Sequence, residues 1–164
     1  MKFERINSIL TESITDLLIA QYEHELRNHE LYRYFSSWAH VNGFPGATKW
    51  FHGQAKEEAA HAKSIYEFLR DSGVTFSLTQ IDYKDVEVQK YEDLYRLGLD
   101  AEISTTESLN KIFEECGNQK SFIAQEFVNR LLYDQLSEET EARHRLAIVS
   151  NGDPLIADHI ITDL

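Results

Sequence analysis

The sequence predicts an all-α fold: a four-helix bundle with a long crossover between its second and third helices and a short fifth helix at the C-terminus. Three observations lead to this prediction. The chain has only two prolines and seven glycines, and most of them fall where long helical segments break. The four main segments are each about 25–30 residues long, which suits a helical bundle. The second connection is long enough to run the length of such a bundle.

The predicted helices cover about residues 11–40, 46–71, 86–116, 121–150 and 154–162. The breaks that separate them are Gly43-Phe44-Pro45-Gly46, Asp71-Ser72-Gly73, Cys116-Gly117-Asn118 and Gly152-Asp153-Pro154. The first and third connections are short, so the helices they join should be antiparallel neighbours. The second connection, about residues 73–85, holds β-branched and aromatic residues without a helical stripe. The whole chain, 1–164, is expected to form a single domain.

Composition and charge narrow the class of function. The chain has 16 Lys and Arg against 28 Asp and Glu, a formal net charge of −12. This balance argues against binding to nucleic acid or to an anionic membrane, and it favours attraction of cations. The longest apolar run, Leu17–Ala20, is too short for a transmembrane helix. Cys116 is the only cysteine, so no disulfide framework is possible and a cytoplasmic protein is expected.

Each long segment carries an apolar stripe with a polar residue at its centre. In the first segment the stripe is Leu18, Tyr22, Glu25, His29 and Tyr32. The central polar residues of the four stripes are Glu25, Glu58, Glu102 and Gln135, with Glu138 one turn after Gln135. All four central residues lie about 12–16 positions into their helices, close to mid-height at about 1.5 Å per residue. Antiparallel packing therefore brings them to one level inside the bundle.

A buried cluster of carboxylates needs protons or a bound cation, because like charges repel and lose hydration. His61 follows Glu58 by three residues, so both side chains lie on one helix face. Oxygen ligands with one imidazole suit iron, manganese or zinc better than copper. The sequence therefore predicts a metal site inside the bundle, and a buried polar network with shared protons is the alternative.

Other histidines and aromatic residues carry weaker signals. Glu141-x-x-His144 repeats the same spacing, but its phase along the helix places it on the surface. His29 shares a face with Glu25 and is expected either to support the site or to pack elsewhere. Tyr32 is two turns from Glu25 on the same stripe, within reach of a metal. The other large aromatic residues are interpreted as core or subunit-interface residues rather than redox relays.

The chain resembles a bacterial non-haem ferritin over nearly its whole length. The matching motifs are Glu25 with Tyr32, Glu57-Glu58-Ala59-Ala60-His61, Glu102, and Gln135 with Glu138. The resemblance implies a ferritin-like bundle with a dinuclear non-haem iron centre. The first iron would be held by Glu25, Glu58 and His61, with Glu58 as the bridge. The second would be held by Glu102 with Gln135, and Tyr32 would lie beside the centre.

The resemblance also implies a third iron site on the cavity side. Glu57 and Glu138 match positions there, and Asp134 replaces a glutamate. Ser137 stands where a further glutamate is usual, which weakens the predicted site. Haem is not expected, because bacterioferritins ligate it with a methionine at the subunit interface and the only methionine here is Met1.

The function implied by the resemblance is iron storage with ferroxidase activity. Fe(II) and O₂ or H₂O₂ would be the substrates, and ferric mineral would collect inside a homo-oligomeric shell of twenty-four subunits. Two other hypotheses stay open on the sequence. One is a rubrerythrin-like di-iron peroxidase or oxidase without a cage, and the other is a shell or metal buffer with an impaired centre.

Overall fold

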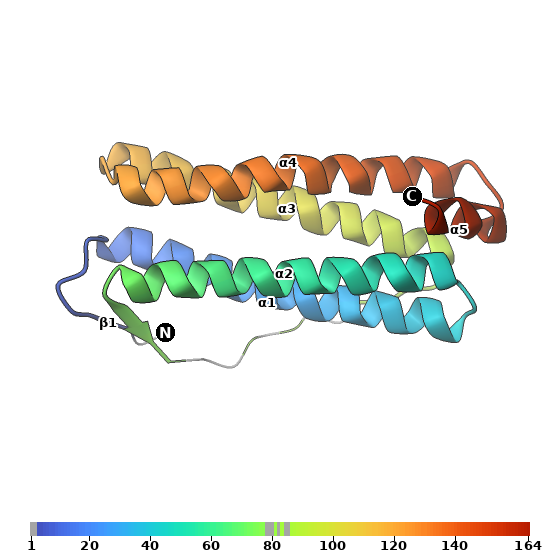
Figure 1. Cartoon of the computed structure of the whole chain (residues 1–164), viewed down its shortest axis with the longest axis horizontal. Coiled ribbons are helices and arrows are strands. Elements are labelled where there is room, and N and C mark those ends of the chain that lie inside the picture. Colours follow the sequence, from blue (N-terminus) through green and yellow to red (C-terminus); the bar gives the residue numbers. More distant parts are fainter. Residues whose placement is uncertain (1–2, 78–80, 82, 84–85) are drawn as a thin grey trace.

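A computed structural model describes residues 3–77, 81, 83 and 86–164, and the predicted all-α bundle is confirmed (Figure 1). Its helices are α1 (Glu12–Val41), α2 (Pro45–Asp71), α3 (Tyr91–Asn118), α4 (Phe122–Ser150) and α5 (Pro154–Thr162). α1 packs against α2 and α3 packs against α4. The two pairs form the bundle, and α5 lies across one end of it (Figure 1). Within the described part of the chain, no helix has the length and apolar character needed to cross a membrane.

The second connection takes the chain from one end of the bundle to the other, since α2 ends opposite the end where α3 begins (Figure 1). It starts with β2 (Val74–Phe76), which pairs antiparallel with β1 (Phe3–Arg5). Neither strand is predicted from the sequence, because a run of three residues is too short to show a strand's alternation. Residues 78–80, 82 and 84–85 of the predicted crossover lie outside the described residues.

The third helix begins at Tyr91, later than the predicted start near residue 86. Val88 is buried in the core from a non-helical segment, and β-branched residues favour extended backbone. The helix then starts at a cap, because the Asp93 carboxylate accepts the backbone N–H of Lys90 at 2.9 Å. A buried valine and a cap therefore decide the boundary, and the apolar periodicity does not.

The break between α3 and α4 also lies later than predicted. α3 continues through Gly117 and ends at Asn118. The chain reverses direction between the two helices at Lys120, which has a φ of 56°. The helical conformation tolerates Gly117, and the left-handed turn residue is a lysine that carries no turn signal in the sequence.

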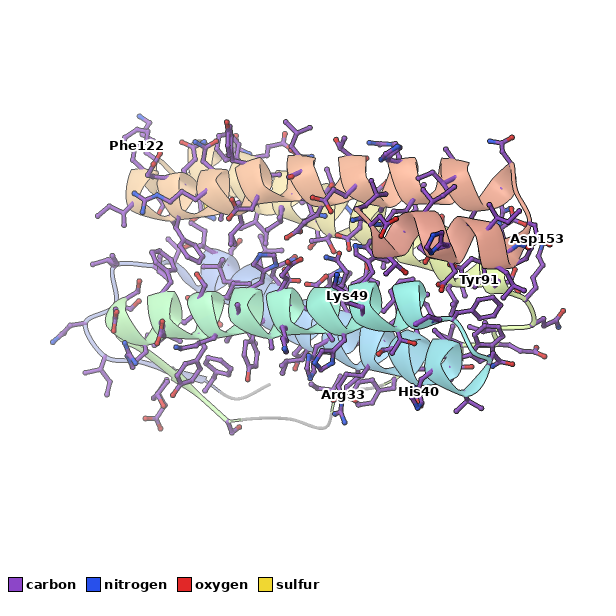
Figure 2. All side chains as sticks on the ribbon, turned by 45° about the vertical axis from the view of Figure 1, so that its right-hand side comes forward. Arg33, His40, Lys49, Tyr91, Phe122 and Asp153 are labelled. Atoms are coloured by element: carbon purple, nitrogen blue, oxygen red, sulfur yellow. The ribbon has the colours of Figure 1, made fainter. Side chains whose placement is uncertain are left out.

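Two apolar clusters fill the two ends of the bundle and leave a polar layer between them. The first cluster includes Ile14, Leu18, Ile65, Leu69, Leu109, Ile112 and Val128. The second includes Tyr32, Phe35, Phe51, Leu94, Tyr95 and Val149. Side chains from both helix pairs meet in this interior (Figure 2). Because each long helix passes from one cluster to the other, its middle residues form a layer enclosed by apolar packing.

α5 is fixed to the bundle by one buried carboxylate. Asp158 accepts the backbone N–H groups of Gly46 at 2.9 Å and Ala47 at 2.7 Å, in the first turn of α2. It also accepts a hydrogen bond from the Tyr91 hydroxyl at 3.0 Å. A carboxylate at a helix N-terminus satisfies unpaired N–H groups and is favoured by the helix dipole. Asp158 thus joins α5 to the starts of α2 and α3.

Candidate metal centre

The four central polar residues of the predicted stripes lie near the middle of helices that are 30, 27, 28 and 29 residues long. Their exposed fractions are 2% for Glu25, 3% for Glu58, 1% for Glu102 and 2% for Gln135. The structure therefore encloses three carboxylates and one amide in the polar layer. Such a group is costly to bury without protons or a cation.

Glu25, Glu58 and His61 form the side of this layer built by α1 and α2. One ligand atom from each lies within 4.8 Å of the other two. His61 Nδ1 is 3.6 Å from Glu58 Oε2, as the i,i+3 spacing on α2 predicts. The three side chains predicted to hold the first metal therefore converge in the fold and could hold a metal ion.

Glu102 forms the side built by α3, held by two neighbours. The Tyr32 hydroxyl donates to Glu102 Oε1, and Gln135 Nε2 donates to Glu102 Oε2 at 2.6 Å. Gln135 Nε2 also reaches the Glu102 backbone carbonyl at 3.2 Å. Both carboxylate oxygens are therefore oriented by donors from α1 and α4, and Gln135 is a hydrogen-bond partner of Glu102.

Glu138 lies on the α4 side of the same imidazole. Its Oε1 atom is 3.4 Å from His61 Nε2. His61 is therefore flanked by Glu58 on one ring nitrogen and by Glu138 on the other. Burial raises the pKa of Glu138 to about 7, with the charges of Glu102 and Glu57 adding to the shift and the charge of His61 opposing it.

The other carboxyl groups are also shifted toward the protonated form. Burial and the neighbouring Glu58 hold the pKa of Glu25 well above its usual range. Burial and the charges of Glu102 and Glu138 do the same to the pKa of Glu58. The pKa of Glu102 is raised by burial, against the opposing hydrogen bonds from Tyr32 and Gln135. Such mutual perturbation is typical of functional sites.

Three carboxylate oxygens in the layer, one each from Glu25, Glu58 and Glu138, are buried and have no hydrogen-bond partner among the described residues. A buried acceptor without a donor is unfavourable. A cation in the layer would satisfy these oxygens. The donor set of carboxylates plus one imidazole is the set expected for iron, manganese or zinc.

The structure separates Glu57 and Asp134 from this buried layer. Both side chains are exposed, and Glu57 accepts a hydrogen bond from Gln54 Nε2 at 2.5 Å. The charge of Glu57 nevertheless raises the pKa of Glu58, Glu102 and Glu138. Of the three residues predicted for a third site, Glu138 is the one in contact with His61.

The other histidine signals lie away from the centre. His29 Nδ1 is 2.6 Å from the backbone carbonyl of Ala55, so its ring is engaged in packing α1 on α2. Glu141 and His144 are exposed, and Glu141 pairs with Arg145 at 2.9 Å. The second Glu-x-x-His is a surface pair, as its helical phase predicts.

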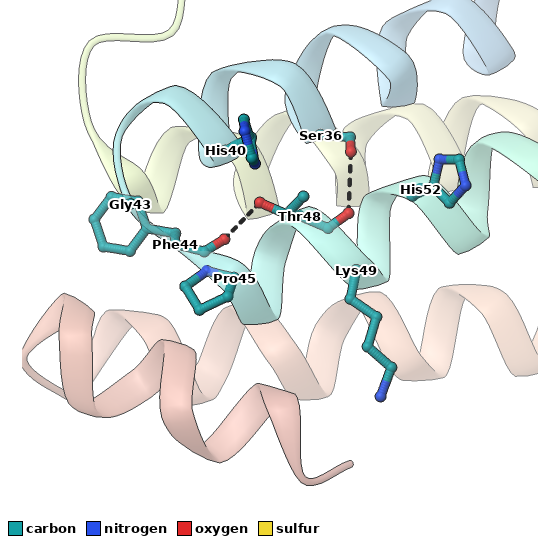
Figure 3. Close-up of a pocket in the computed structure, with 8 residues that line it drawn as sticks. All are labelled: Ser36, His40, Gly43, Phe44, Pro45, Thr48, Lys49 and His52. Carbon is teal, nitrogen blue, oxygen red and sulfur yellow. Dashed lines mark hydrogen bonds between the residues drawn. The ribbon is translucent and has the colours of Figure 1, made fainter.

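A surface pocket of about 480 Å³ at the α1–α2 turn is unrelated to the carboxylate layer (Figure 3). None of the described residues that line it carries a carboxylate. Its hydroxyl groups are occupied by backbone carbonyls, since Ser36 donates to Thr48 O at 3.0 Å and Thr48 donates to Phe44 O at 2.7 Å. Lys49 points away from His40 (Figure 3).

Gln21 is a site residue that sequence reasoning missed. It is fully buried, and its Nε2 atom donates to Glu25 Oε1 at 2.7 Å. The predicted stripe of α1 placed Tyr22 at this level, but Tyr22 is only half-buried. The signal was present in the i,i+4 spacing of Gln21 and Glu25, which places an amide donor one turn from a buried carboxylate.

Comparison with known proteins agrees with this geometry. A sequence profile described as the ferritin-like domain matches residues 15–150. A bacterial non-heme ferritin from Staphylococcus saprophyticus is 26% identical over 131 residues, which cover 80% of this chain and 78% of that protein. One from Campylobacter jejuni is 24% identical over 131 residues, with coverage of 80% and 78%.

Solved structures show the same fold at low identity. An open pore ferritin from Archaeoglobus fulgidus has a TM-score of 0.87 and 20% identity, covering 93% of this chain and 97% of that chain. M. penetrans ferritin has a TM-score of 0.88 and 18% identity, covering 94% and 97%. The resemblance to bacterial non-haem ferritins is therefore confirmed. The profile match spans most of the chain, and this protein belongs to the ferritin-like domain family.

Proposed function

We propose that this protein oxidises Fe(II) at a dinuclear centre within each subunit and stores the ferric product inside a shell of twenty-four subunits. Family and fold support iron storage in general. The relatives described above are ferritins, so the rubrerythrin-like alternative gains no support from them. The observation that carries the finer proposal is the enclosed layer of carboxylates around His61.

In this proposal the first iron is bound by Glu25, Glu58 and His61, and Glu58 bridges to the second. The second iron is bound by Glu102, with Gln135 as a ligand or as the donor that orients Glu102. O₂ or H₂O₂ takes up the electrons. Negative oxygen ligands stabilise Fe(III) more than Fe(II), because the higher charge interacts more strongly with them in a low-dielectric interior.

The neighbours of the ligands keep the centre organised. Tyr32 and Gln135 hold both oxygens of Glu102, and Gln21 holds one oxygen of Glu25. The remaining oxygen of Glu25 is left without a partner among the described residues and is free for iron. Donors fixed around a ligand reduce the reorganisation that metal binding requires.

Glu57, Asp134 and Glu138 are proposed to bind a third ion on the way to the mineral. Two of the three side chains are exposed, as a transfer site requires. Glu138 contacts His61 at 3.4 Å and provides continuity with the centre. With Ser137 in place of a carboxylate, this site is expected to bind iron more weakly than the buried pair.

Exposed apolar side chains support assembly into a homo-oligomer. Leu155, Ile156 and Ile160 on α5 are 67%, 62% and 45% exposed. Tyr133 and Leu136 on α4 are 79% and 66% exposed. Exposed apolar surface is typical of faces that contact another protein chain. We assign these two helices to subunit contacts of the shell.

Aerobic Fe(II) addition tests the proposed function. The oxidation rate is measured by the absorbance of Fe(III), and the particle mass by size-exclusion chromatography with light scattering before and after loading. Glu58→Gln is expected to slow oxidation by at least about tenfold, whereas Glu141→Gln, in the surface Glu-x-x-His, is expected to match the unaltered protein. Circular dichroism confirms that both variants fold.

Two results would contradict the proposal. Oxidation by Glu58→Gln at the unaltered rate would remove the centre from the reaction. A protein that stays a monomer or dimer and takes up only a pair of irons per chain would exclude storage and would point to a di-iron enzyme on the same bundle.

A further inference from the structure

An unbroken series of ring contacts leads from the candidate centre toward α5. It begins at Tyr32, whose hydroxyl donates to Glu102. The Tyr32 ring stacks on Phe51 with centroids 5.9 Å apart, and Phe51 packs against Tyr95 with centroids 5.1 Å apart. Tyr32, Phe51 and Tyr95 are all at most 1% exposed. Contacts of this kind are short enough for an electron to pass between the two phenols.

The far phenol has its own route for a proton. The Tyr95 hydroxyl oxygen is 3.1 Å from that of Tyr91, and Tyr91 donates to Asp158 Oδ1 at 3.0 Å. A phenol carries a single proton, so Tyr91 accepts from Tyr95 while it donates to Asp158. The three groups form a directed chain from a buried phenol to a buried carboxylate. A phenol that loses an electron becomes strongly acidic and needs such an acceptor.

The neighbouring indole is disfavoured as the oxidised group. Trp50 stacks on Tyr95 with centroids 5.4 Å apart and ring planes at 10°. The Arg145 guanidinium carbon lies over the same Trp50 ring, 4.8 Å from its centroid. A cation over an aromatic face stabilises the neutral ring and opposes the positive charge that electron loss would create. Of the two stacked rings, Tyr95 is therefore the one from which loss of an electron is favoured.

We propose that Tyr95 receives an oxidising equivalent from the iron centre through Tyr32 and Phe51, and that α5 supplies the proton acceptor, Asp158. The inference rests on the proposed function, which supplies the iron and the peroxide. This electron transfer would move a radical away from the carboxylate and imidazole ligands, which would otherwise be oxidised.

A second electron donor is needed when H₂O₂ reacts at a centre that holds a single Fe(II). Cleavage of the O–O bond to give two waters takes two electrons and two protons. Fe(II) gives one electron and becomes Fe(III). Tyr32 gives the second electron, and its phenolic proton passes to Glu102 along their hydrogen bond. Both protons consumed by the peroxide come from solvent, and the Tyr32 proton stays on Glu102 until the Tyr32 radical is reduced.

The transfer to Tyr95 also balances. An electron passes from Tyr95 through Phe51 to the Tyr32 radical, and Tyr32 regains a proton through Glu102. The Tyr95 proton moves to Tyr91, whose own proton moves to Asp158. The products are neutral Tyr32, a Tyr95 radical and a protonated Asp158. The next Fe(II) at the centre returns an electron by the same path, and the proton shifts reverse.

The test loads the assembled protein with one Fe(II) per chain without oxygen, adds H₂O₂, and freezes samples at increasing times for electron paramagnetic resonance. We expect a long-lived tyrosyl signal in the unaltered protein and its loss in Tyr95→Phe. Tyr91→Phe keeps the Tyr95 ring but removes its proton acceptor, so the signal should be smaller and decay faster. Tyr83→Phe, at a tyrosine that is 53% exposed and lies outside the series of ring contacts, is the matched control and should leave the signal unchanged.

The outcomes separate the relay from the proposed function. Fe(II) oxidation without a tyrosyl signal, or with a signal that survives Tyr95→Phe, would overturn the relay and leave the ferroxidase proposal standing. Loss of the signal in Tyr34→Phe alone would direct the electron along Tyr32, Phe35 and Tyr34, whose rings are 6.0 and 5.9 Å apart, and would also overturn it. Absence of iron oxidation would overturn both.

Discussion

Tyr32 on α1 donates its hydroxyl hydrogen bond to Glu102 on α3, so one phenol joins the two helix pairs at the level of the candidate centre. Tyr32 is 1% exposed, and its ring is enclosed by Phe35 and Phe51. The position of Glu102 is thus fixed by the apolar packing of a residue from another helix.

Replacing Tyr32 by Phe should leave one oxygen of Glu102 without its donor and lower the stability of the metal-free protein. A buried acceptor left unpaired costs about 1–3 kcal/mol. Urea unfolding of the chelator-treated protein at neutral pH measures the change. Tyr83→Phe is the control, because Tyr83 is 53% exposed, and it should have almost no effect. An equal loss in both variants would contradict the role of the Glu102 hydrogen bond.

The metal-free protein should become less stable as the pH rises from about 5 to about 8. The folded-state pKa values of Glu25, Glu58, Glu102 and Glu138 are all raised, that of Glu138 to about 7. A raised pKa means that the folded state binds protons more tightly than the unfolded chain. The resulting stability is complete below the unfolded value and is lost as the pH passes the folded value.

Urea midpoints across this pH range, with chelator present, measure the slope. Glu25→Gln should flatten it, because a neutral amide replaces one titrating group. A saturating divalent cation should oppose the loss at high pH, since it binds the ionised carboxylates. Stability that increases with pH over this range in the chelated protein would contradict the raised pKa values.

Gly46→Ala should weaken the attachment of α5. A Cβ atom at Gly46 would lie 2.3 Å from the backbone oxygen of Asp158, which is closer than atoms can approach. α5 must therefore move, and the hydrogen bonds from Gly46 and Ala47 to Asp158 are strained or lost. We expect a lower melting temperature and faster amide exchange in α5. Gly53→Ala, where a Cβ meets nothing within 4 Å, is the control and should be neutral or slightly stabilising.

The proposed third ion should depend on the exposed acids and not on the buried pair. In Glu57→Gln combined with Asp134→Asn, anaerobic Fe(II) titration should show loss of the weakest binding event and retention of the two tighter ones. Both side chains are exposed, so the fold should be unaffected. Retention of all binding events would exclude these two residues as ligands.

Much of the fold follows from local patterns in the sequence. Polar residues at the centres of four apolar stripes place Glu25, Glu58, Glu102 and Gln135 at one level, and the structure buries all four. Helical spacing also pairs Glu58 with His61. These features are predictable because a helix fixes the direction of its side chains by simple periodicity.

Features that depend on contacts distant in sequence were not predictable. Asp158 meets Gly46 and Tyr91 only after the bundle has formed, and nothing in the sequence near residue 158 indicates these partners. The burial of Gln21 in place of Tyr22 depends on how α1 rotates against its neighbours. A stripe read from one helix has an uncertainty of one position in phase, and tertiary packing resolves it.

The most direct test of the central claim is a crystal structure of the protein loaded anaerobically with Fe(II), with anomalous scattering at the iron edge. Two iron peaks per chain inside the bundle are expected, one bound by Glu25, Glu58 and His61 and the other by Glu102, with Glu58 between them. Iron absent from this layer, or bound only at the exposed acids Glu57 and Asp134, would contradict the dinuclear centre.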